Sequence, residues 1–176
     1  MFCIKSGRLT LRDLVLDDWK LFYDLMQEPE TRRYMGDYLK AETEDEAKKW
    51  VTQTMAFNNE TPRHSYNLAI EFNDEAIGWI GIGEAQSEEK KDLDFGYALK
   101  KTFWGNGFMT EALQSVIKYC FDSLPIQRIT GECESSNIAS QKVMQKSGMN
   151  RIKTYVFKDE ESGQEKEKII FHIDKP

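Results

Sequence analysis

The apolar residues after Gly107 constrain the fold of this chain more than any other pattern. From Gly107 to Phe121 they recur at steps of three and four residues, which predicts an α-helix with one buried face. Predicted strands lie on either side of this helix, at Asp92 to Leu99 and at Arg128 to Cys133. A helix between two strands favours a fold in which helices pack on a sheet. The apolar face consists of Met109, Ala112, Leu113, Val116, Ile117 and Cys120.

The N-terminal third contains a strand and two helices. Arg8 to Arg12 alternates between polar and apolar residues, as a half-buried strand does. Asp17 is a candidate N-cap for a helix that ends before Pro29. Thr43 and Glu46 have the spacing of a capping box and open a second helix.

The remaining elements complete the predicted architecture. The order β-α-α-β-β-β-α-β-α-β-β predicts an α/β sandwich around a mixed, largely antiparallel sheet, in one domain over 1–176. A hairpin turn is predicted at Asn73 and Asp74, and Asn137 and Gly148 are predicted to cap and end the last helix. These elements are Ser65 to Phe72, Ala76 to Glu84, Ile138 to Lys146, Arg151 to Phe157 and Lys166 to Ile173.

Composition and charge narrow the class of protein. No apolar run approaches the roughly 20 residues that cross a bilayer, and Met1 to Lys5 lacks the start of a secretory signal. We therefore expect a cytoplasmic protein without a membrane partner. The net charge of −6 argues against a nucleic-acid partner. The three cysteines and two histidines have no metal-type spacing, so no metal site is expected.

The loop before the long helix is the strongest candidate for a ligand site. Gly105 and Gly107 remove the Cβ atoms that would keep a ligand from the backbone. The N–H groups of the first helical turn, at the positive end of the helix dipole, then favour an anion such as a pyrophosphate. Lys100 and Lys101 are candidates for a cationic rim. A tight turn without a ligand is the alternative interpretation of the two glycines alone.

Two familiar phosphate-binding loops do not fit this segment. The position three residues after Gly107 is Thr110, so the third glycine of a dinucleotide-binding fingerprint is missing. The chain also lacks the Gly-Lys-Ser/Thr sequence of nucleoside-triphosphate loops. A nucleotide-dependent oxidoreductase is therefore disfavoured.

Four motifs lie between Leu93 and Met149: Phe95 to Leu99, Trp104 to Ala112, Asn137 to Ser140 and Lys146 to Met149. In this order and spacing they resemble the GNAT superfamily of N-acetyltransferases, specifically its RimJ/RimL-like branch. The resemblance implies a mixed, mostly antiparallel sheet of six to seven strands flanked by about four helices. It also implies acetyl-coenzyme A as the cofactor and an amine as the acceptor.

The resemblance assigns cofactor contacts to specific positions. The backbones of Tyr97, Ala98 and Leu99 would hydrogen-bond to pantetheine, and Asn137 and Ser140 would face the cofactor from the second helix. Trp104 would form a wall of the site or anchor the loop in the core. The pyrophosphate cradle would consist of Gly105, Asn106, Gly107, Phe108 and Met109, with a hydroxyl from Thr110.

Three positions depart from the wider family. Thr102 replaces a common Gln or Arg, so phosphate contacts are expected from the backbone. Met144 occupies the helical position that often carries a tyrosine acid. Ser140 is therefore our candidate proton donor to the coenzyme A thiolate, with a local backbone hydrogen bond as the alternative role. Met149 replaces the usual Phe, a change that concerns packing alone.

Catalysis also needs a base, because the attacking amine must be neutral. A free α-amine has a pKa of about 7.7–8.0, so a modest base suffices. Asp94 and Glu84, at the ends of neighbouring predicted strands, are the candidates, and simple solvation is the alternative for each. None of the three cysteines has a recognisable base partner, so we expect direct transfer without a covalent intermediate.

The acceptor is defined only by class. Resemblance favours the N-terminal amine of a protein or peptide, with Tyr34 and Tyr38 as candidate lining residues. A small amine, such as a polyamine, aminoglycoside or amino-acid derivative, is the alternative acceptor. A noncatalytic acyl-coenzyme A binding module is the alternative class. The strand Lys166 to Ile173 is a candidate for pairing across a homodimer or for an ordinary internal strand.

Overall fold

The computed structural model describes residues 1–35, 41–85, 92–159 and 163–176. Five α-helices and eight strands lie in these residues. The strands are β1 (Cys3–Lys5), β2 (Thr10–Asp13), β3 (Ser65–Phe72), β4 (Glu75–Glu84), β5 (Asp92–Leu99), β6 (Arg128–Glu134), β7 (Asn150–Lys158) and β8 (Glu165–Asp174). The helices are α1 (Trp19–Gln27), α2 (Pro29–Met35), α3 (Glu44–Asn58), α4 (Phe108–Ser123) and α5 (Ile138–Lys146).

The strands form one mixed sheet in the order β1-β2-β3-β4-β5-β6-β8-β7. Neighbouring strands are antiparallel except for β5 and β6, which are parallel. The predicted fold class is therefore confirmed. The strand and helix counts exceed the prediction because β1 has three residues and α2 has seven, too few for a clear periodic pattern.

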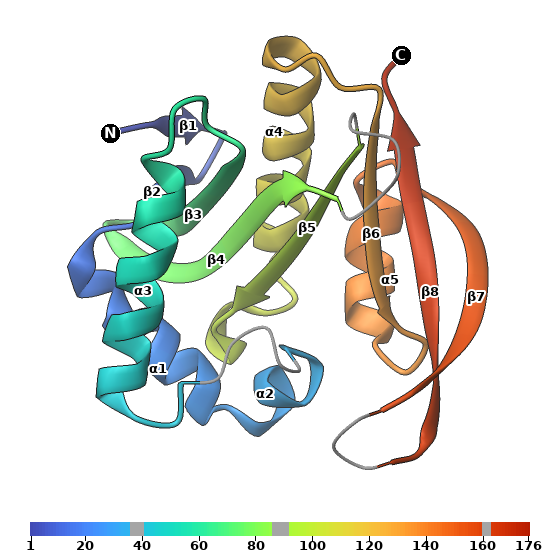
Figure 1. Cartoon of the computed structure of the whole chain (residues 1–176), viewed down its shortest axis with the longest axis horizontal. Coiled ribbons are helices and arrows are strands. Elements are labelled where there is room, and N and C mark those ends of the chain that lie inside the picture. Colours follow the sequence, from blue (N-terminus) through green and yellow to red (C-terminus); the bar gives the residue numbers. More distant parts are fainter. Residues whose placement is uncertain (36–40, 86–91, 160–162) are drawn as a thin grey trace.

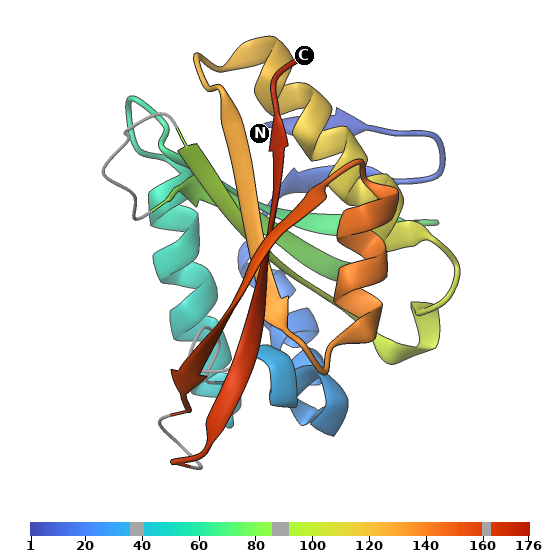
Figure 2. The same cartoon turned by 90° about the vertical axis from the view of Figure 1, so that its right-hand side faces the viewer.

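Helices cover both faces of the sheet (Figure 2). On one face α4 presents Leu113 and Val116 to a core that includes Ile80 and Ile129 of the strands, and α5 adds Met144. On the other face α1 and α3 pack on β3 and β4. The two cores fix α4 and α5 on one side of β5, and α1 on the other.

Local sequence signals account for several boundaries. The predicted capping box is present: Thr43 Oγ1 accepts a hydrogen bond from Glu46 N. Asn73 and Asp74 have φ values of 50° and 62°, the left-handed conformation that a two-residue hairpin turn needs. The predicted cap Asp17 is wrong, because a short 3-10 turn moves the N-cap of α1 to Asp18.

The position of β8 shows whether the predicted strand Lys166 to Ile173 pairs inside the chain or across a homodimer. β8 lies between β6 and β7 and is antiparallel to both. Both of its edges are therefore paired inside the chain. It is an internal strand, and pairing of β8 across a homodimer is wrong.

Candidate functional site

The parallel strands β5 and β6 separate soon after they meet. Their register pairs only Asp92 with Arg128, Leu93 with Ile129, and Asp94 with Thr130. Figure 1 shows the two strands side by side at one end and diverging toward α2. The remainder of β5 therefore has an edge that β6 does not cover.

The backbone direction of β5 decides which groups face this open edge. Lys100 N donates to Ile77 O at 2.8 Å, and the same antiparallel register pairs Ala98 with Trp79. Bonded pairs recur at every second residue of an antiparallel ladder, so Ala98 directs its N–H and C=O toward β4. The residues with backbone groups on the opposite side, toward the open edge, are Phe95, Tyr97 and Leu99.

Only two of the three residues predicted to contact pantetheine have backbone groups on the open edge. Tyr97 and Leu99 direct backbone groups toward the open edge, whereas Ala98 does not. The Leu99 carbonyl already accepts a hydrogen bond of 2.7 Å from Trp104 Nε1. Trp104 is 40% exposed, so its indole anchors the loop to the end of β5 without entering the core.

Phe95 occupies the space where the strands separate. A Cβ atom on Gly131 of β6 would lie 2.3 Å from Phe95 Cζ, so the ring rests directly on the Gly131 backbone. The Phe95 ring also stacks on Tyr97, with centroids 5.8 Å apart and planes 13° apart. Phe95 and Tyr97 thus form an aromatic floor on the α4 and α5 side of the open edge.

The glycine loop leads from β5 to α4. Gly105 and Gly107 both have φ of 78°, and Gly107 is the N-cap of α4. The first hydrogen bond of the helix runs from Glu111 N to Gly107 O. The helix itself therefore leaves three N–H groups without an internal partner, the arrangement expected of an anion cradle. These groups belong to Phe108, Met109 and Thr110.

The side chains of the loop are engaged with the protein. Phe108 and Met109 are buried, so the backbone is what they offer to a ligand. Asn106 Nδ2 donates to the carbonyls of Phe103 and Trp104 at 3.2 and 3.1 Å. The predicted cradle therefore offers backbone groups to a ligand, while the side chains of the loop contact the rest of the protein.

Arg8 supplies a cation that the sequence motifs do not indicate. Its Nε donates to Glu111 Oε2 at 2.8 Å, and its Nη1 donates to Asn106 O at 3.2 Å. The guanidinium also stacks on Phe108 at 4.4 Å. Lys100 and Lys101, the expected cationic rim, are instead paired with Glu75 and Glu30.

Ser140 lies on α5 opposite β5. Asn137 Oδ1 accepts a hydrogen bond of 3.0 Å from Ser140 N, which confirms the predicted cap. The Tyr97 hydroxyl lies 2.8 Å from Ser140 Oγ. Burial raises the pKa of Tyr97, so the phenol is neutral near physiological pH.

Asp94 stands at the point where β5 and β6 separate. Burial and the nearby charge of Glu132 raise the pKa of this carboxyl. Glu132 is held by Tyr155 Oη and Lys168 Nζ, each at 2.7 Å. Burial opposes the ionised form of Glu132, but these two hydrogen bonds lower its pKa. No local sequence pattern predicts that Glu132 lies near Asp94, because the four residues of this cluster come one each from β5, β6, β7 and β8.

Glu84 does not share the face of Asp94. The register pairs Asp94 with Gly83, and successive residues of a strand point to opposite faces. The Glu84 carboxylate lies 2.8 Å from His64 Nδ1, and both side chains are at least half exposed. The structure therefore places the two candidate bases on opposite sides of the sheet.

The two buried cysteines are poor nucleophiles. Burial raises the pKa of Cys120 to about 12 and that of Cys133 to about 11. Thiolate is the reactive form of cysteine, and these values leave very little of it at neutral pH. Cys3 is exposed.

Tyr34 and Tyr38 are the predicted acceptor-lining residues. The Tyr34 hydroxyl, on α2, lies 3.5 Å from the carbonyl oxygen of Ser136, in the turn after β6. This contact places α2 across the wide end of the gap between β5 and β6. Tyr38 lies outside the described residues.

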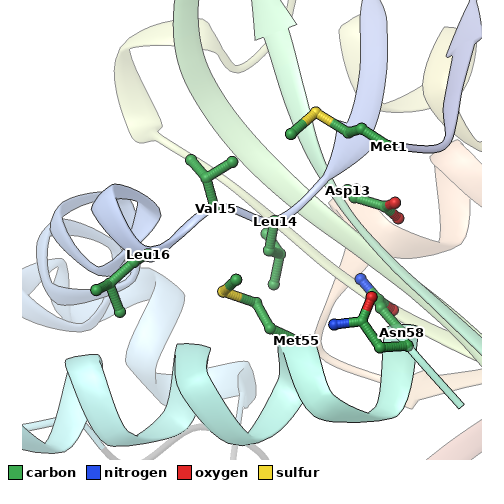
Figure 3. Close-up of a pocket in the computed structure, with 8 residues that line it drawn as sticks. Met1, Asp13, Leu14, Val15, Leu16, Met55 and Asn58 are labelled. Carbon is green, nitrogen blue, oxygen red and sulfur yellow. The ribbon is translucent and has the colours of Figure 1, made fainter.

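A cavity of about 230 Å³ lies apart from this region, between the end of β2 and α3 (Figure 3). Its single carboxylate, Asp13, already accepts hydrogen bonds from Phe2 N and Arg63 Nη2, each at 2.7 Å. We therefore assign no chemistry to it. Its lining is Met1, Asp13, Leu14, Val15, Leu16, Met55, Asn58 and Asn59.

Neither a metal site nor a membrane-spanning helix is present in the described part of the chain. Among those residues, His, Cys, Asp and Glu form no group that could hold a metal ion. None of the helices seen there is long and apolar enough to cross a membrane.

Comparisons with known proteins agree with this architecture. A family model described as an acetyltransferase (GNAT) domain matches residues 8–150. An uncharacterized N-acetyltransferase from Bacillus licheniformis, p20, is 30% identical over 156 residues, or 86% of each chain. The structure of RimL, a ribosomal-protein alpha-N-acetyltransferase in complex with coenzyme A, superposes with a TM-score of 0.82 at 18% identity, over 98% of each chain.

A second solved structure has the same fold. It is MccE, a microcin self-immunity acetyltransferase in complex with acetyl-CoA and AMP. Its TM-score is 0.83 at 19% identity, over 96% of this chain and 93% of that one. The family match and the relative at 30% identity define an acyltransferase of the N-acetyltransferase class. The chain belongs to the GNAT acetyltransferase family.

Proposed function

We propose that this chain transfers the acetyl group of acetyl-coenzyme A directly to a primary amine, and that the acceptor is the N-terminal amine of a protein or peptide. One observation carries the proposal. The open edge of β5 connects the glycine loop before α4 with Asp94 and Ser140. A linear thioester with an anionic end fits such a path, because the anion cradle and the candidate acid and base lie along one strand and its neighbours.

The backbone holds the cofactor in this proposal. The N–H groups at the start of α4 bind the pyrophosphate, and the positive end of the helix dipole stabilises its charge. Arg8 offsets the negative charge of Glu111 beside this cradle. The pantetheine arm extends along β5 and hydrogen-bonds to the open backbone groups of Tyr97. The Phe95 and Tyr97 rings form the apolar floor beneath it.

Asp94 is the proposed base. Its raised pKa makes it a better proton acceptor than an ordinary carboxylate. A free α-amine needs only modest help to lose its proton, whereas a lysine side chain with a pKa of about 10.4 needs more. We prefer Asp94 to Glu84 because Glu84 is bonded to His64 on the opposite face.

Ser140 is the proposed proton donor to the departing thiolate. Tyr97 packs against the core on the face of the sheet that α4 and α5 cover, and Ser140 lies on the same face. The side chain of Asp94 points to the opposite face, because successive residues of a strand alternate between the two faces. The amine therefore approaches the thioester from the Asp94 side and sulfur departs on the Ser140 side. This separation lets the base act on nitrogen while the donor acts on sulfur.

Direct transfer is favoured over a covalent intermediate because Cys120 and Cys133 retain their protons at neutral pH. The test is a variant in which Cys3, Cys120 and Cys133 are all replaced by Ser, assayed as folded protein. Retained turnover agrees with direct transfer. Loss of turnover in a variant with native circular dichroism would require a cysteine in the mechanism.

The choice of acceptor rests on charge and on the resemblance to RimL. Asp94 and Glu132 place two carboxylates at the narrow end of the gap, where β5 and β6 begin to separate, and negative charge there suits a cationic amine. RimL acts on a ribosomal protein's α-amine, as its name states. A peptide N-terminus is therefore our first choice.

The acceptor is tested with a panel of N-terminal peptides and small amines, in which coenzyme A release and acetylated product are both measured. We expect acetylation of peptide α-amines and none of the same peptides after N-terminal blocking. Activity on polyamines or aminoglycosides alone would overturn the acceptor class. Cofactor binding without thiol release to any acceptor would indicate a noncatalytic binding module.

A further inference from the structure

The Tyr97 side chain links β5 to α5 across the region where β5 and β6 have separated. Its hydroxyl lies 2.8 Å from Ser140 Oγ and 3.4 Å from Ser140 O, although the two residues are 43 positions apart in the chain. The ring stacks on Phe95, which rests on the Gly131 backbone. Aromatic packing therefore fixes the position of the hydroxyl before any ligand binds.

Ser140 is restrained from two directions. Its backbone N–H is bound by Asn137 at the start of α5, so its Cα position is fixed. Its hydroxyl then has two neighbours, the Tyr97 phenol and the Cys133 thiol. The geometry allows either hydroxyl to donate in this hydrogen bond. A phenol is a stronger acid than an alcohol, so we take Tyr97 as the donor and Ser140 as the acceptor. The Ser140 proton is thereby directed away from Tyr97.

We propose that Tyr97 is a positioning residue for acetyl transfer, and that its hydroxyl holds Ser140 so that the Ser140 proton points at the departing sulfur of coenzyme A. This inference rests on the proposed function. Met144, at the helical position where the wider family often has a tyrosine, is buried and 1% exposed. In this chain a phenol therefore reaches the site from β5 and acts through Ser140.

Tyr97 keeps its proton throughout the transfer of the acetyl group. The amine nitrogen bonds to the thioester carbon, the carbon–sulfur bond breaks, and its electron pair passes to sulfur. Nitrogen passes one proton to Asp94, and sulfur takes one proton from Ser140. Exchange with solvent then returns Asp94 and Ser140 to their starting protonation states. Ser140 stabilises the negative charge that develops on sulfur, and the hydrogen bond from Tyr97 strengthens Ser140 as a donor.

The experiment measures the pKa of the coenzyme A thiol while it is bound to the protein. Thiolate absorbance is followed against pH in the coenzyme A complex, and the same titration with desulfo-coenzyme A is subtracted to remove tyrosine ionisation. We expect the bound thiol to have a lower pKa than free coenzyme A. Tyr97→Phe and Ser140→Ala should each raise it by about 0.5–1 unit, the worth of one hydrogen bond.

Kinetics with a peptide that has a free N-terminal amine provide a second readout. Tyr97→Phe should lower kcat about tenfold and leave the KM for acetyl-CoA unchanged. The double variant Tyr97→Phe with Ser140→Ala should be no slower than Ser140→Ala alone, because Tyr97 acts through Ser140. Tyr119→Phe is the matched control, since it removes a partly buried hydroxyl that donates to Tyr66 Oη at 3.3 Å, away from β5 and α5.

Failure of the role proposed for Tyr97 and failure of the proposed function give different results. An unchanged bound-thiol pKa in Tyr97→Phe, or rate losses that multiply in the double variant, would overturn the role of Tyr97. Equal effects of Tyr119→Phe and Tyr97→Phe would also overturn it, by showing a general loss of stability. A wild-type protein that does not bind coenzyme A would contradict the proposed function itself, and with it the role of Tyr97.

Discussion

Arg8 and Glu111 form a salt bridge of 2.8 Å beside the glycine loop, although 103 positions separate them in the chain. Glu111 lies in the first turn of α4, where its charge would repel a bound phosphate. It also accepts hydrogen bonds from Ser6 Oγ and Arg8 N, at 3.0 and 2.7 Å. Burial opposes its ionised form, but these bonds lower the pKa of Glu111, so its negative charge persists at neutral pH.

Replacement of Arg8 should therefore weaken cofactor binding more than folding. Arg8→Gln should raise the Kd for coenzyme A roughly 10- to 100-fold, since hydrogen bonds to charged groups are worth about 1.5–3 kcal/mol. An exposed salt bridge contributes about 0–1 kcal/mol to folding, so the melting temperature should change little. Calorimetric titration measures the Kd, and Arg128→Gln, which loses a surface pair with Asp174, is the control. Equal Kd values for coenzyme A in the two variants would show that Arg8 does not contribute to cofactor binding.

The conformation of the glycine loop permits a test with a matched control. Gly105 has φ of 78° and Gly163 has φ of 67°, and an added Cβ would meet no atom within 4 Å at either position. Alanine should therefore cost each site a similar backbone strain of about 1 kcal/mol. Only Gly105→Ala should raise the Kd for coenzyme A, because Gly163 lies in the turn before β8. Equal affinities would place the cradle elsewhere.

A valine at Gly107 is a less informative test. Gly107 also has a positive φ, and β-branched residues rarely adopt that conformation. Gly107→Val should therefore destabilise the start of α4 and weaken binding together. Differential scanning calorimetry of the apoprotein should show a lower Tm for this variant than for Gly105→Ala.

Asp94 should control the acid limb of the pH profile. A base must be ionised, so kcat/KM should fall as pH falls through the raised pKa of Asp94 and that of the acceptor amine. Asp94→Asn should lower kcat by about 10²–10⁴-fold, the usual contribution of a general base. Glu132→Gln should move the acid limb to lower pH, because it removes a neighbouring negative charge. A wild-type rate in Asp94→Asn would exclude Asp94 as the base.

The same raised pKa has a consequence for stability. A carboxyl whose pKa is higher in the folded than in the unfolded state binds protons more tightly when folded, so its ionisation destabilises the fold as pH rises. Asp94→Asn should therefore be more stable than wild type at pH 7. The difference in unfolding free energy between Asp94→Asn and wild type should shrink when the pH falls below the ordinary carboxyl pKa of about 3.9. Denaturant titrations at several pH values measure it, and a variant less stable than wild type at pH 7 would contradict this sign.

Sequence patterns predicted those features of the fold and of the candidate site that depend on residues close together in the chain. The caps Thr43 and Asn137, and the hairpin at Asn73, each depend on residues within three positions. The glycine loop was found because a strand pattern changes to a helical one beside it. β1 and α2 were missed because they are too short to show a period.

Contacts that depend on the assembled sheet were not predictable from one sequence. Arg8 reaches Glu111 only because the loop before β2 folds over the start of α4. Tyr97 was predicted as a backbone contact, and its bond to Ser140 follows from the separation of β5 from β6. The two candidate bases looked equivalent because strand register, which places Asp94 and Glu84 on opposite faces, is a property of the sheet.

In our proposal, the open edge of β5 and the start of α4 bind acetyl-coenzyme A. The most direct measurement is calorimetric titration of the protein with acetyl-CoA and, separately, with NAD. We predict saturable binding of one acetyl-CoA per chain, weakened in Gly105→Ala, and no binding of NAD. Saturable binding of NAD without affinity for acetyl-CoA would show that this region is not an acetyl-CoA site.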